Sequence, residues 1–137
     1  MSAPRPSAML AVAVGGALGA VLRWWLGEVA PDGAGFPGTT FAINVGGAFG
    51  LGLLPAVAAV RRRPLLTAGI GTGVLGGFTT LSTASEQARV LLASGQVLLG
   101  LVYVVGTLLA AVAAVAVADR LSTRAQQARV EAEGGDE

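Results

Sequence analysis

The residues best suited to chemistry lie in one stretch of an otherwise apolar segment. From Gly76 to Glu86 the chain carries five hydroxyl side chains, an adjacent pair of glycines and one carboxylate. Irregular backbone is tolerated inside a membrane only where protein or water covers it, and interrupted helices expose carbonyls that bind cations. The stretch predicts a broken helix that contacts an ion. The alternative is a continuous helix whose hydroxyls bond to its own carbonyls.

Other polar residues are spaced along the apolar segments. Asn44 lies near the middle of the second segment, one turn after Thr40, and Tyr103 precedes Thr107 by one turn in the fourth. A buried amide in hydrocarbon is costly unless it finds partners. Asn44 therefore either bonds to another helix or lines an ion path. The side chains of Tyr103 and Thr107 can face the same path.

One arginine continues a glycine face of the first segment. Arg23 comes four residues after Gly19, so its side chain is expected to point at protein or at a water-filled vestibule rather than at lipid. In a vestibule its positive charge would raise the local concentration of anions near a pore mouth. The alternative is an anchor whose guanidinium reaches the headgroup region.

The composition excludes most enzymatic functions and nucleic-acid binding. The chain has no His and no Cys, so Ser82 and Ser85 lack the base that activates a nucleophile. The nine basic residues are scattered and the net charge is +1, unlike the massed charge of a nucleic-acid-binding surface. We therefore expect neither an enzyme nor a nucleic-acid partner.

Four long apolar segments must position the polar residues. Charged side chains make up only 12% of the chain, against about a quarter in ordinary soluble domains. A membrane helix needs roughly 20 mostly apolar residues. The segments that qualify span about residues 8–26, 37–60, 65–92 and 96–118. We predict an all-α membrane protein with four transmembrane helices over residues 1–121, the third one broken, and a polar tail over 122–137 that is disordered or a frayed helix.

The first segment has a second interpretation. Arg5 precedes its apolar run, as in a cleaved signal peptide. The far end of the segment carries Arg23, Trp24 and Trp25, and Trp is enriched where a helix meets the headgroups. An interfacial anchor of this kind favours a helix that stays in the mature protein.

Small residues repeat at four-residue spacing in three of the segments. The repeats are Gly15 and Gly19; Gly46 and Gly50; and Gly69, Gly73 and Gly77. Ridges of small residues let helix backbones approach closely inside a membrane. We expect a compact bundle that forms an oligomer.

The basic residues divide unequally between the two sides of the membrane. With four spans, both termini and the loop between the second and third segments share one side, while Arg23 and Arg89 belong to the other. The remaining seven basic residues are Arg5, Arg61, Arg62, Arg63, Arg120, Arg124 and Arg129. Lys and Arg favour the cytoplasmic side. Both termini are therefore predicted to be cytoplasmic, in a multi-pass protein of a bacterial cell membrane.

Three stretches together resemble the Fluc/CrcB family of fluoride channels. They cover residues 15–23, 38–49 and 76–83, and the number, order and length of the helices also match. The resemblance implies a dimer of two four-helix subunits packed antiparallel, with two fluoride pores. It further implies a structural sodium ion (Na+) on the central axis, which is held by the backbone carbonyls of Gly76 and Thr79 from each subunit and is not transported.

The resemblance also implies a function and a pore lining. Fluoride would leave the cell passively, down its electrochemical gradient, and its cytoplasmic concentration would fall. A pore must replace the water of this small anion with hydrogen-bond donors and still release it. Arg23 would lie at the vestibule or the subunit interface. The side chains implied along the fluoride path are Asn44, Ser82, Thr83, Tyr103 and Thr107.

The chain departs from the family's motif at a few positions. Leu81 and Ala84 stand where members normally have phenylalanines, whose positive ring edges can meet an anion, and Ala111 stands where members often have a hydroxyl. An antiparallel homodimer also needs nearly balanced loops, which this chain lacks. Both features lead to the hypothesis of a heterodimer with a separately encoded homologue of opposite orientation, in which one of the two pores has decayed.

Two other functions are compatible with the sequence. A non-conducting structural subunit of a heterodimeric channel would explain the loss of the aromatic pair. A small proton-coupled multidrug exporter would have a similar size, but it needs a carboxylate inside the membrane, and Glu86 is the one candidate. Coupling of efflux to protons would distinguish an exporter from a channel.

Overall fold

The structure, a computed structural model, describes residues 5–134, and every regular element within this range is helical. The major helices are α1 (Pro6–Val29), α2 (Gly38–Leu53), α6 (Leu81–Ala93) and α7 (Val97–Gly134). Shorter elements connect α2 to α6. These are the 3₁₀ turn η1 (Leu54–Ala56), α3 (Ala58–Arg61), α4 (Pro64–Thr67), the π-helix η2 (Ala68–Leu75) and α5 (Gly76–Phe78).

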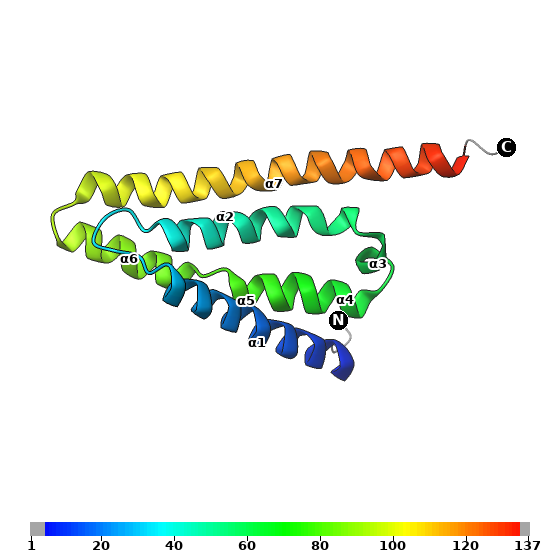
Figure 1. The fold of residues 1–137 in the computed structure, drawn as a ribbon, viewed down its shortest axis with the longest axis horizontal. Helices are drawn as coiled ribbons and strands as arrows, with labels where there is room; N and C mark the ends of the chain where they lie inside the picture. The colour runs from blue at the N-terminus through cyan, green and yellow to red at the C-terminus, as the bar shows by residue number, and fades with distance from the viewer. Residues whose placement is uncertain (1–4, 135–137) are drawn as a thin grey trace.

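Within residues 5–134, four helical stretches are long and apolar enough to cross a membrane, as predicted. They are Pro6–Val29, Gly38–Ala56, Pro64–Ala93 and Val97–Ala125. Figure 1 shows the loop from α1 to α2 and the turn from α6 to α7 at one end of the bundle. The α3 region and both ends of the described chain lie at the opposite end (Figure 1). This arrangement agrees with an even number of membrane crossings.

The second helix ends earlier than the predicted range of 37–60. It passes through η1 at Leu54–Ala56, and Val57 is then extended, with φ −86° and ψ 97°. Pro55 lies inside η1; it has no backbone N–H and disfavours helical geometry at its neighbours. The last turn of the predicted helix is therefore the separate element α3, and the prediction was wrong beyond Ala56.

The tail is helical where the structure describes it. A disordered segment was one expectation from residue 122 onward, but α7 continues to Gly134, so that expectation was wrong for residues 122–134. The rest of the tail, residues 135–137, lies outside the described residues. Ala118 and Ser122 are 0% and 1% exposed, and the sequence contains neither Gly nor Pro between Gly106 and Gly134. The 38 residues give a helix about 57 Å long, well beyond a hydrocarbon core of about 30 Å.

Glycine faces join α1 to the third span. Ideal Cβ atoms built on Gly15 and Gly19 would collide with the carbonyl oxygens of Gly69 and Val74, and one on Gly77 would collide with that of Gly16. Close backbone approach therefore accounts for these glycines, as predicted. The second helix differs, because a Cβ on Gly46 would meet nothing within 4 Å. Its neighbour Gly47 instead faces the side chain of Thr79.

The apolar core lies between α6 and α7. Ala88, Leu91 and Tyr103 form its buried centre, and Phe41, Ala84 and Leu99 pack against it. Phe36 from the loop before α2 contacts the Tyr103 ring edge-on, with ring centroids 5.5 Å apart. The core thus fixes the tyrosine ring in place beside the third span.

Candidate functional site

The third span is broken at Thr79 and Thr80, as predicted. α5 ends at Phe78, and Thr79 and Thr80 are extended, with ψ angles of 155° and 114°. α6 then begins at Leu81, where the Thr80 hydroxyl caps the new helix by accepting the Thr83 N–H at 3.1 Å. Ser and Thr are favoured at such caps because their oxygens satisfy the first free N–H groups of a helix.

Asn44 from α2 holds the break together. Its Nδ2 donates to the Thr80 carbonyl at 3.0 Å, and its Oδ1 accepts the Thr80 N–H at 2.8 Å. The amide thus pairs with both backbone groups of one residue that no longer has helical partners. The bond to another helix, one of the two alternatives for Asn44, is therefore present. The second N–H of Nδ2 remains for another acceptor.

The break releases several carbonyls from their helical donors, among them those of Gly76 and Thr79. The Thr80 N–H would bond to the Gly76 carbonyl in a continuous helix, but it bonds to Asn44. The Thr83 N–H would bond to the Thr79 carbonyl, but it bonds to the Thr80 hydroxyl. Gly76 is exposed and Thr79 is half-buried. Both carbonyl oxygens are therefore left to accept from, or coordinate, something outside the helix.

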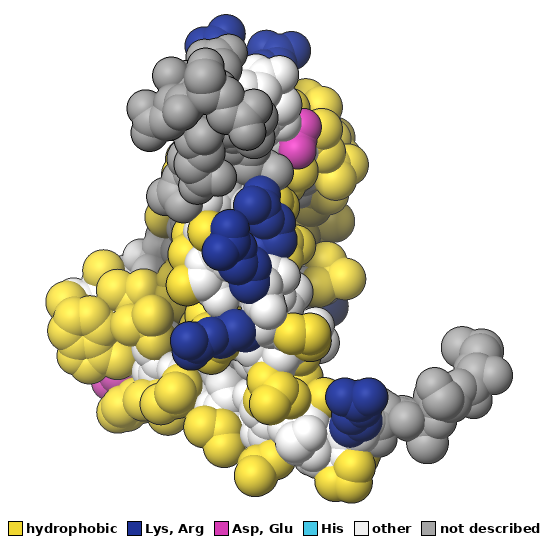
Figure 2. Space-filling view, turned by 90° about the vertical axis from the view of Figure 1, so that its right-hand side faces the viewer, with side chains coloured by type: hydrophobic (Ala, Val, Ile, Leu, Met, Phe, Trp, Pro, Cys, Tyr) yellow, Lys and Arg dark blue, Asp and Glu magenta, His cyan; other side chains and the backbone are white. Residues whose placement is uncertain are grey.

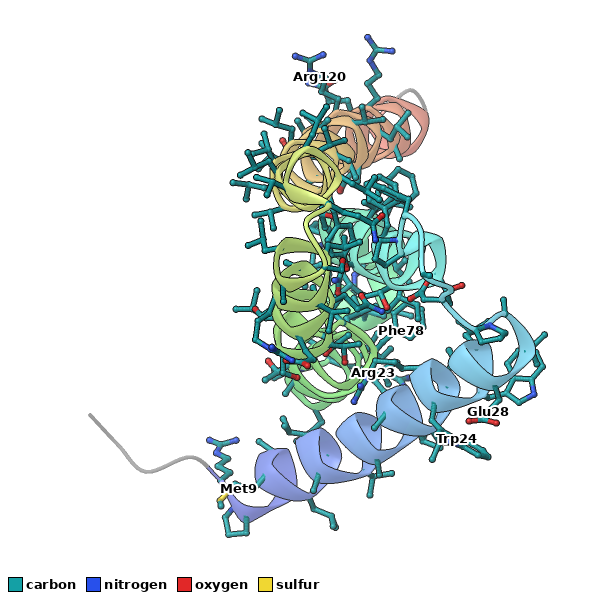
Figure 3. All side chains as sticks on the ribbon, turned by 90° about the vertical axis from the view of Figure 1, so that its left-hand side faces the viewer. Met9, Arg23, Trp24, Glu28, Phe78 and Arg120 are labelled. Atoms are coloured by element: carbon teal, nitrogen blue, oxygen red, sulfur yellow. The ribbon has the colours of Figure 1, made fainter. Side chains whose placement is uncertain are left out.

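Arg23 connects α1 to the same break. Its Nε donates to the Gly77 carbonyl at 3.2 Å, and Figure 3 shows it on the side of α1 that faces the third span, opposite Trp24. The side chain points at protein, as predicted. The Gly77 carbonyl is thereby occupied, whereas the carbonyls of Gly76 and Thr79 are not.

Two cavities flank the break. The arginine cavity, about 490 Å³, is lined by Arg23, Asp32, Thr40, Thr80 and Thr83 among others. The tyrosine cavity, about 450 Å³, is lined among others by Asn44, Thr79, Thr80, Tyr103 and Thr107. Thr80 is 8% exposed and borders both. The break therefore forms the partition between the two cavities.

The structure brings most of the predicted site residues together, in two groups. Arg23 and Thr83 border the arginine cavity. The tyrosine cavity collects Asn44, Tyr103 and Thr107. Ser82 lines neither of them; its hydroxyl lies 3.3 Å from that of Thr80.

The hydroxyl protons are unequally committed. Thr107 donates to the carbonyl of Tyr103 at 2.6 Å, one turn earlier in the same helix, and Tyr103 donates to Gln87 at 2.8 Å. The Thr83 hydroxyl accepts from Thr80 at 2.9 Å, so its own proton stays available. Thr83 is therefore a ready donor to an anion in the arginine cavity.

Asp32 and Gln87 belong to the site but were not singled out from the sequence. Asp32 Oδ1 accepts the Thr39 N–H at 2.7 Å and Oδ2 accepts the Thr40 N–H at 3.1 Å, so the carboxylate caps the N-terminus of α2. Pro37, the N-cap residue, supplies no side-chain hydrogen bond. An Asp in a Gly- and Pro-rich loop before a helix is a capping signal that could have been noticed. The contact with Gln87, 55 residues away, has no such signal.

The Asp32 carboxyl has a lowered pKa. Burial by itself raises the pKa, but hydrogen bonds from Thr40, Thr39 and Gln87 outweigh burial and bring it below 3.8. Hydrogen bonds to the charged form stabilise that form, and the helix N-terminus has the same effect. The Asp32 side chain is therefore ionised at neutral pH and acts only as an acceptor.

The two positions that lack the family's phenylalanines border the tyrosine cavity. Leu81 is 82% exposed, and Ala84 packs against the core beside Tyr103. Ala111 lies at the same cavity. This wall thus offers aliphatic carbons where ring edges would otherwise stand.

Comparison with known proteins identifies the family. The model of the family described as "CrcB-like protein, Camphor Resistance (CrcB)" matches residues 10–118. The chain belongs to this CrcB-like family. The match spans all four membrane-crossing stretches as far as residue 118 and stops before the C-terminal extension of α7.

Several curated proteins are similar to this chain over most of their length. A protein of Nocardia farcinica named "Fluoride-specific ion channel FluC 2" is 45% identical over 125 residues, covering 84% of this chain and 89% of the relative. A Bacillus subtilis protein of the same name is 44% identical over 103 residues, covering 74% and 77%. "Fluoride-specific ion channel FluC 1" of Streptomyces coelicolor is 43% identical over 111 residues, covering 76% and 70%.

Proposed function

We propose that this chain is a subunit of a fluoride-specific ion channel that lowers cytoplasmic fluoride by passive efflux. The observation that carries the proposal is the pair of cavities that meet at the helix break, with Arg23 and Thr83 in the first and the Asn44 amide in the second, in a chain whose relatives are named fluoride channels. A channel of this kind consumes no cofactor and catalyses no reaction. Its task is to replace the water around fluoride with donors that hold the anion weakly.

Arg23 and Thr83 give the arginine cavity a charge and a donor that suit a small anion. The same cavity is also lined by two carboxylates, those of Asp32 and Glu28. Arg23 is half-buried there and bonds to the break through Nε, so its charge is held close to the path. Thr83 offers an uncommitted hydroxyl proton, and Asn44 offers one N–H on the far side of Thr80. Conduction requires that the anion enter the pore and that it leave again. The fixed positive charge would favour entry, and the neutral donors would hold the anion weakly enough to release it.

A single substitution tests this path. Thr83→Val removes the hydroxyl and keeps the shape of the side chain. We expect fluoride efflux from proteoliposomes, followed with a fluoride electrode, to fall by roughly tenfold or more, because one hydrogen bond to a charged species is worth about 1.5–3 kcal/mol. Ser94→Ala, at the turn after α6 and away from both cavities, is the matched control. Equal efflux from Thr83→Val and Ser94→Ala would contradict the proposed path.

We also propose that Gly76 and Thr79 hold a structural sodium ion. Sodium is a hard cation that takes oxygen ligands, and the fit rests on their two carbonyls, which the break releases. One subunit offers too few oxygens for a complete shell, so a second subunit would supply the rest. Replacing sodium with N-methylglucamine should lower the melting temperature of the assembly, and potassium should not restore it. An identical melting temperature in all three salts would exclude the site.

The assembly proposed here is an antiparallel dimer with a homologue of opposite orientation. Large apolar side chains are exposed on every span, among them Leu22, Leu51, Leu81 and Leu108. The end of the bundle that carries α3 presents several basic side chains, all arginines (Figure 2). Such a charge bias favours one orientation, with the termini in the cytoplasm of a bacterial cell. Co-expression with a homologue should yield a mixed dimer; a conducting dimer of this chain alone would contradict the heterodimer.

A non-conducting structural role is the second candidate. It is favoured by the aliphatic wall that Leu81 and Ala84 give the tyrosine cavity. The double substitution Leu81→Phe with Ala84→Phe would restore the ring edges and should raise fluoride efflux if this wall limits conduction. The exporter has less support, because Glu86 is exposed and already pairs with Arg89 at 2.7 Å.

A further inference from the structure

A chain of hydrogen bonds links the walls of the two cavities and ends on one carboxylate. Tyr103 Oη donates to Gln87 Oε1 at 2.8 Å. Gln87 Nε2 donates to Asp32 Oδ2 at 2.8 Å and to Thr40 Oγ1 at 3.0 Å. Thr40 Oγ1 donates to Asp32 Oδ2 at 2.6 Å. Tyr103 borders the tyrosine cavity, whereas Thr40 and Asp32 border the arginine cavity.

The direction of the chain follows from its last member. An ionised carboxylate only accepts, so Thr40 and the Gln87 amide nitrogen must both donate to Asp32. With its nitrogen committed there, Gln87 can present only its oxygen to Tyr103. The phenol then has to donate. Every proton of the chain therefore points toward Asp32, and Tyr103, which is 1% exposed, has none left for an anion.

We propose that Asp32 is a positioning residue that sets this direction and so withholds the Tyr103 proton from fluoride in the tyrosine cavity. The inference rests on the proposed function. Asp32 touches neither the break nor the free carbonyls, and it acts through Gln87. If Asp32 could no longer accept, the Gln87 amide could turn, donate to Tyr103 and leave the phenol proton for the cavity.

Two substitutions at Asp32 separate its hydrogen bonds from its charge. Asp32→Asn removes the charge, and its amide oxygen can take the place of Oδ2, which receives three of the four hydrogen bonds. Asp32→Ala removes both charge and acceptor. The proposal predicts roughly fivefold faster fluoride efflux in Asp32→Ala than in Asp32→Asn, the effect of about one net hydrogen bond. In a Tyr103→Phe background the two variants should conduct equally. The same fivefold ratio in that background would overturn the proposal.

A spectroscopic measurement decides the point without conduction. The chain has a single tyrosine, so a difference between variants of this chain in the tyrosine Raman doublet reports on Tyr103, and the intensity ratio of the doublet differs between a donating and an accepting phenol. Wild type and Asp32→Asn should give the donor ratio, and Asp32→Ala should shift it. Gln87→Met, which removes the acceptor and leaves the α2 cap in place, should shift it as well. One unchanged ratio in all four proteins would overturn the proposal. A shifted ratio without fluoride efflux would reject the proposed function alone.

Discussion

At the break in the third span and at the loop before α2, a side chain pairs with backbone groups that have no helical partner, but the side chain is an amide at the break and a carboxylate at the loop. Both places expose backbone groups that have lost helical partners. At the break, the Asn44 amide serves the N–H and the carbonyl of Thr80 together. At the loop, the Asp32 carboxylate serves two N–H groups and also a hydroxyl and an amide. An amide can pair with a free N–H and a free carbonyl at once. A carboxylate only accepts, so every group that bonds to it must donate.

The largest expected effect is at the amide. Asn44→Ala leaves the N–H and the carbonyl of Thr80 without partners in a buried place, and each unpaired group costs about 1–3 kcal/mol. We expect a loss of roughly 3 kcal/mol in the free energy of unfolding in detergent. Equal stability of Asn44→Ala and wild type would show that the hydrogen bonds of Asn44 do not stabilise the break.

Packing behind the break gives the next effect. A Cβ on Gly19 would collide with the Val74 carbonyl and lie 2.8 Å from the Phe78 nitrogen, whereas a Cβ on Gly27 in the same helix meets nothing within 4 Å. Gly19→Ala should cost about 1–3 kcal/mol through overpacking. Gly27→Ala should be neutral or stabilising by up to about 1 kcal/mol, since Ala favours helix. Thermal unfolding compares the two, and equal melting temperatures would refute a close helix contact at Gly19.

Acid should reduce the stability that Asp32 contributes at the loop before α2, and it should leave the contacts of Asn44 at the break unchanged. The folded pKa of Asp32 lies below 3.8, so its contribution to stability is complete above that value and is lost as the pH falls through the folded pKa. Asp32→Asn, which loses the charge at the helix N-terminus, should cost about 0.5–1 kcal/mol at neutral pH. The difference between the two proteins should shrink in acid. A constant difference from pH 7 downward would mean that Asp32 does not titrate in this way.

The smallest effect is expected at a surface ion pair of α6. Glu86 and Arg89 are three residues apart, and their side chains are 59% and 66% exposed. Exposed pairs of this kind contribute little. Glu86→Gln should change neither stability nor fluoride efflux measurably. Loss of efflux in Glu86→Gln would show that this carboxylate takes part in transport and would favour the exporter.

Much of the fold could be predicted from the sequence because it depends on local composition. Long apolar runs gave the four spans, and hydroxyls beside paired glycines gave the break at Thr79 and Thr80. The end of the second helix and the glycine that contacts the third span were missed, because each depends on a single neighbouring residue. Pro55 ended the second helix early, and Gly47 rather than Gly46 met the third span. These outcomes depend on which side of a helix its partner approaches.

The candidate site was only partly predictable for a related reason. Asn44 drew attention because an amide is conspicuous within an apolar segment. Gln87 lies on α6 among other polar residues, and its role appears only when the fold brings Asp32 and Tyr103 to it from opposite directions along the chain. Such a network has no sequence period, so the direction of its hydrogen bonds becomes readable only from the structure.

The most direct test of fluoride-selective conduction is anion efflux from liposomes that contain the chain together with a co-expressed homologue, with fluoride and chloride followed in the same preparation. Fluoride should leave rapidly while chloride stays inside, and fluoride efflux should fall in Thr83→Val. Fluoride efflux no faster than from protein-free liposomes, or equal loss of both anions, would contradict fluoride-selective conduction.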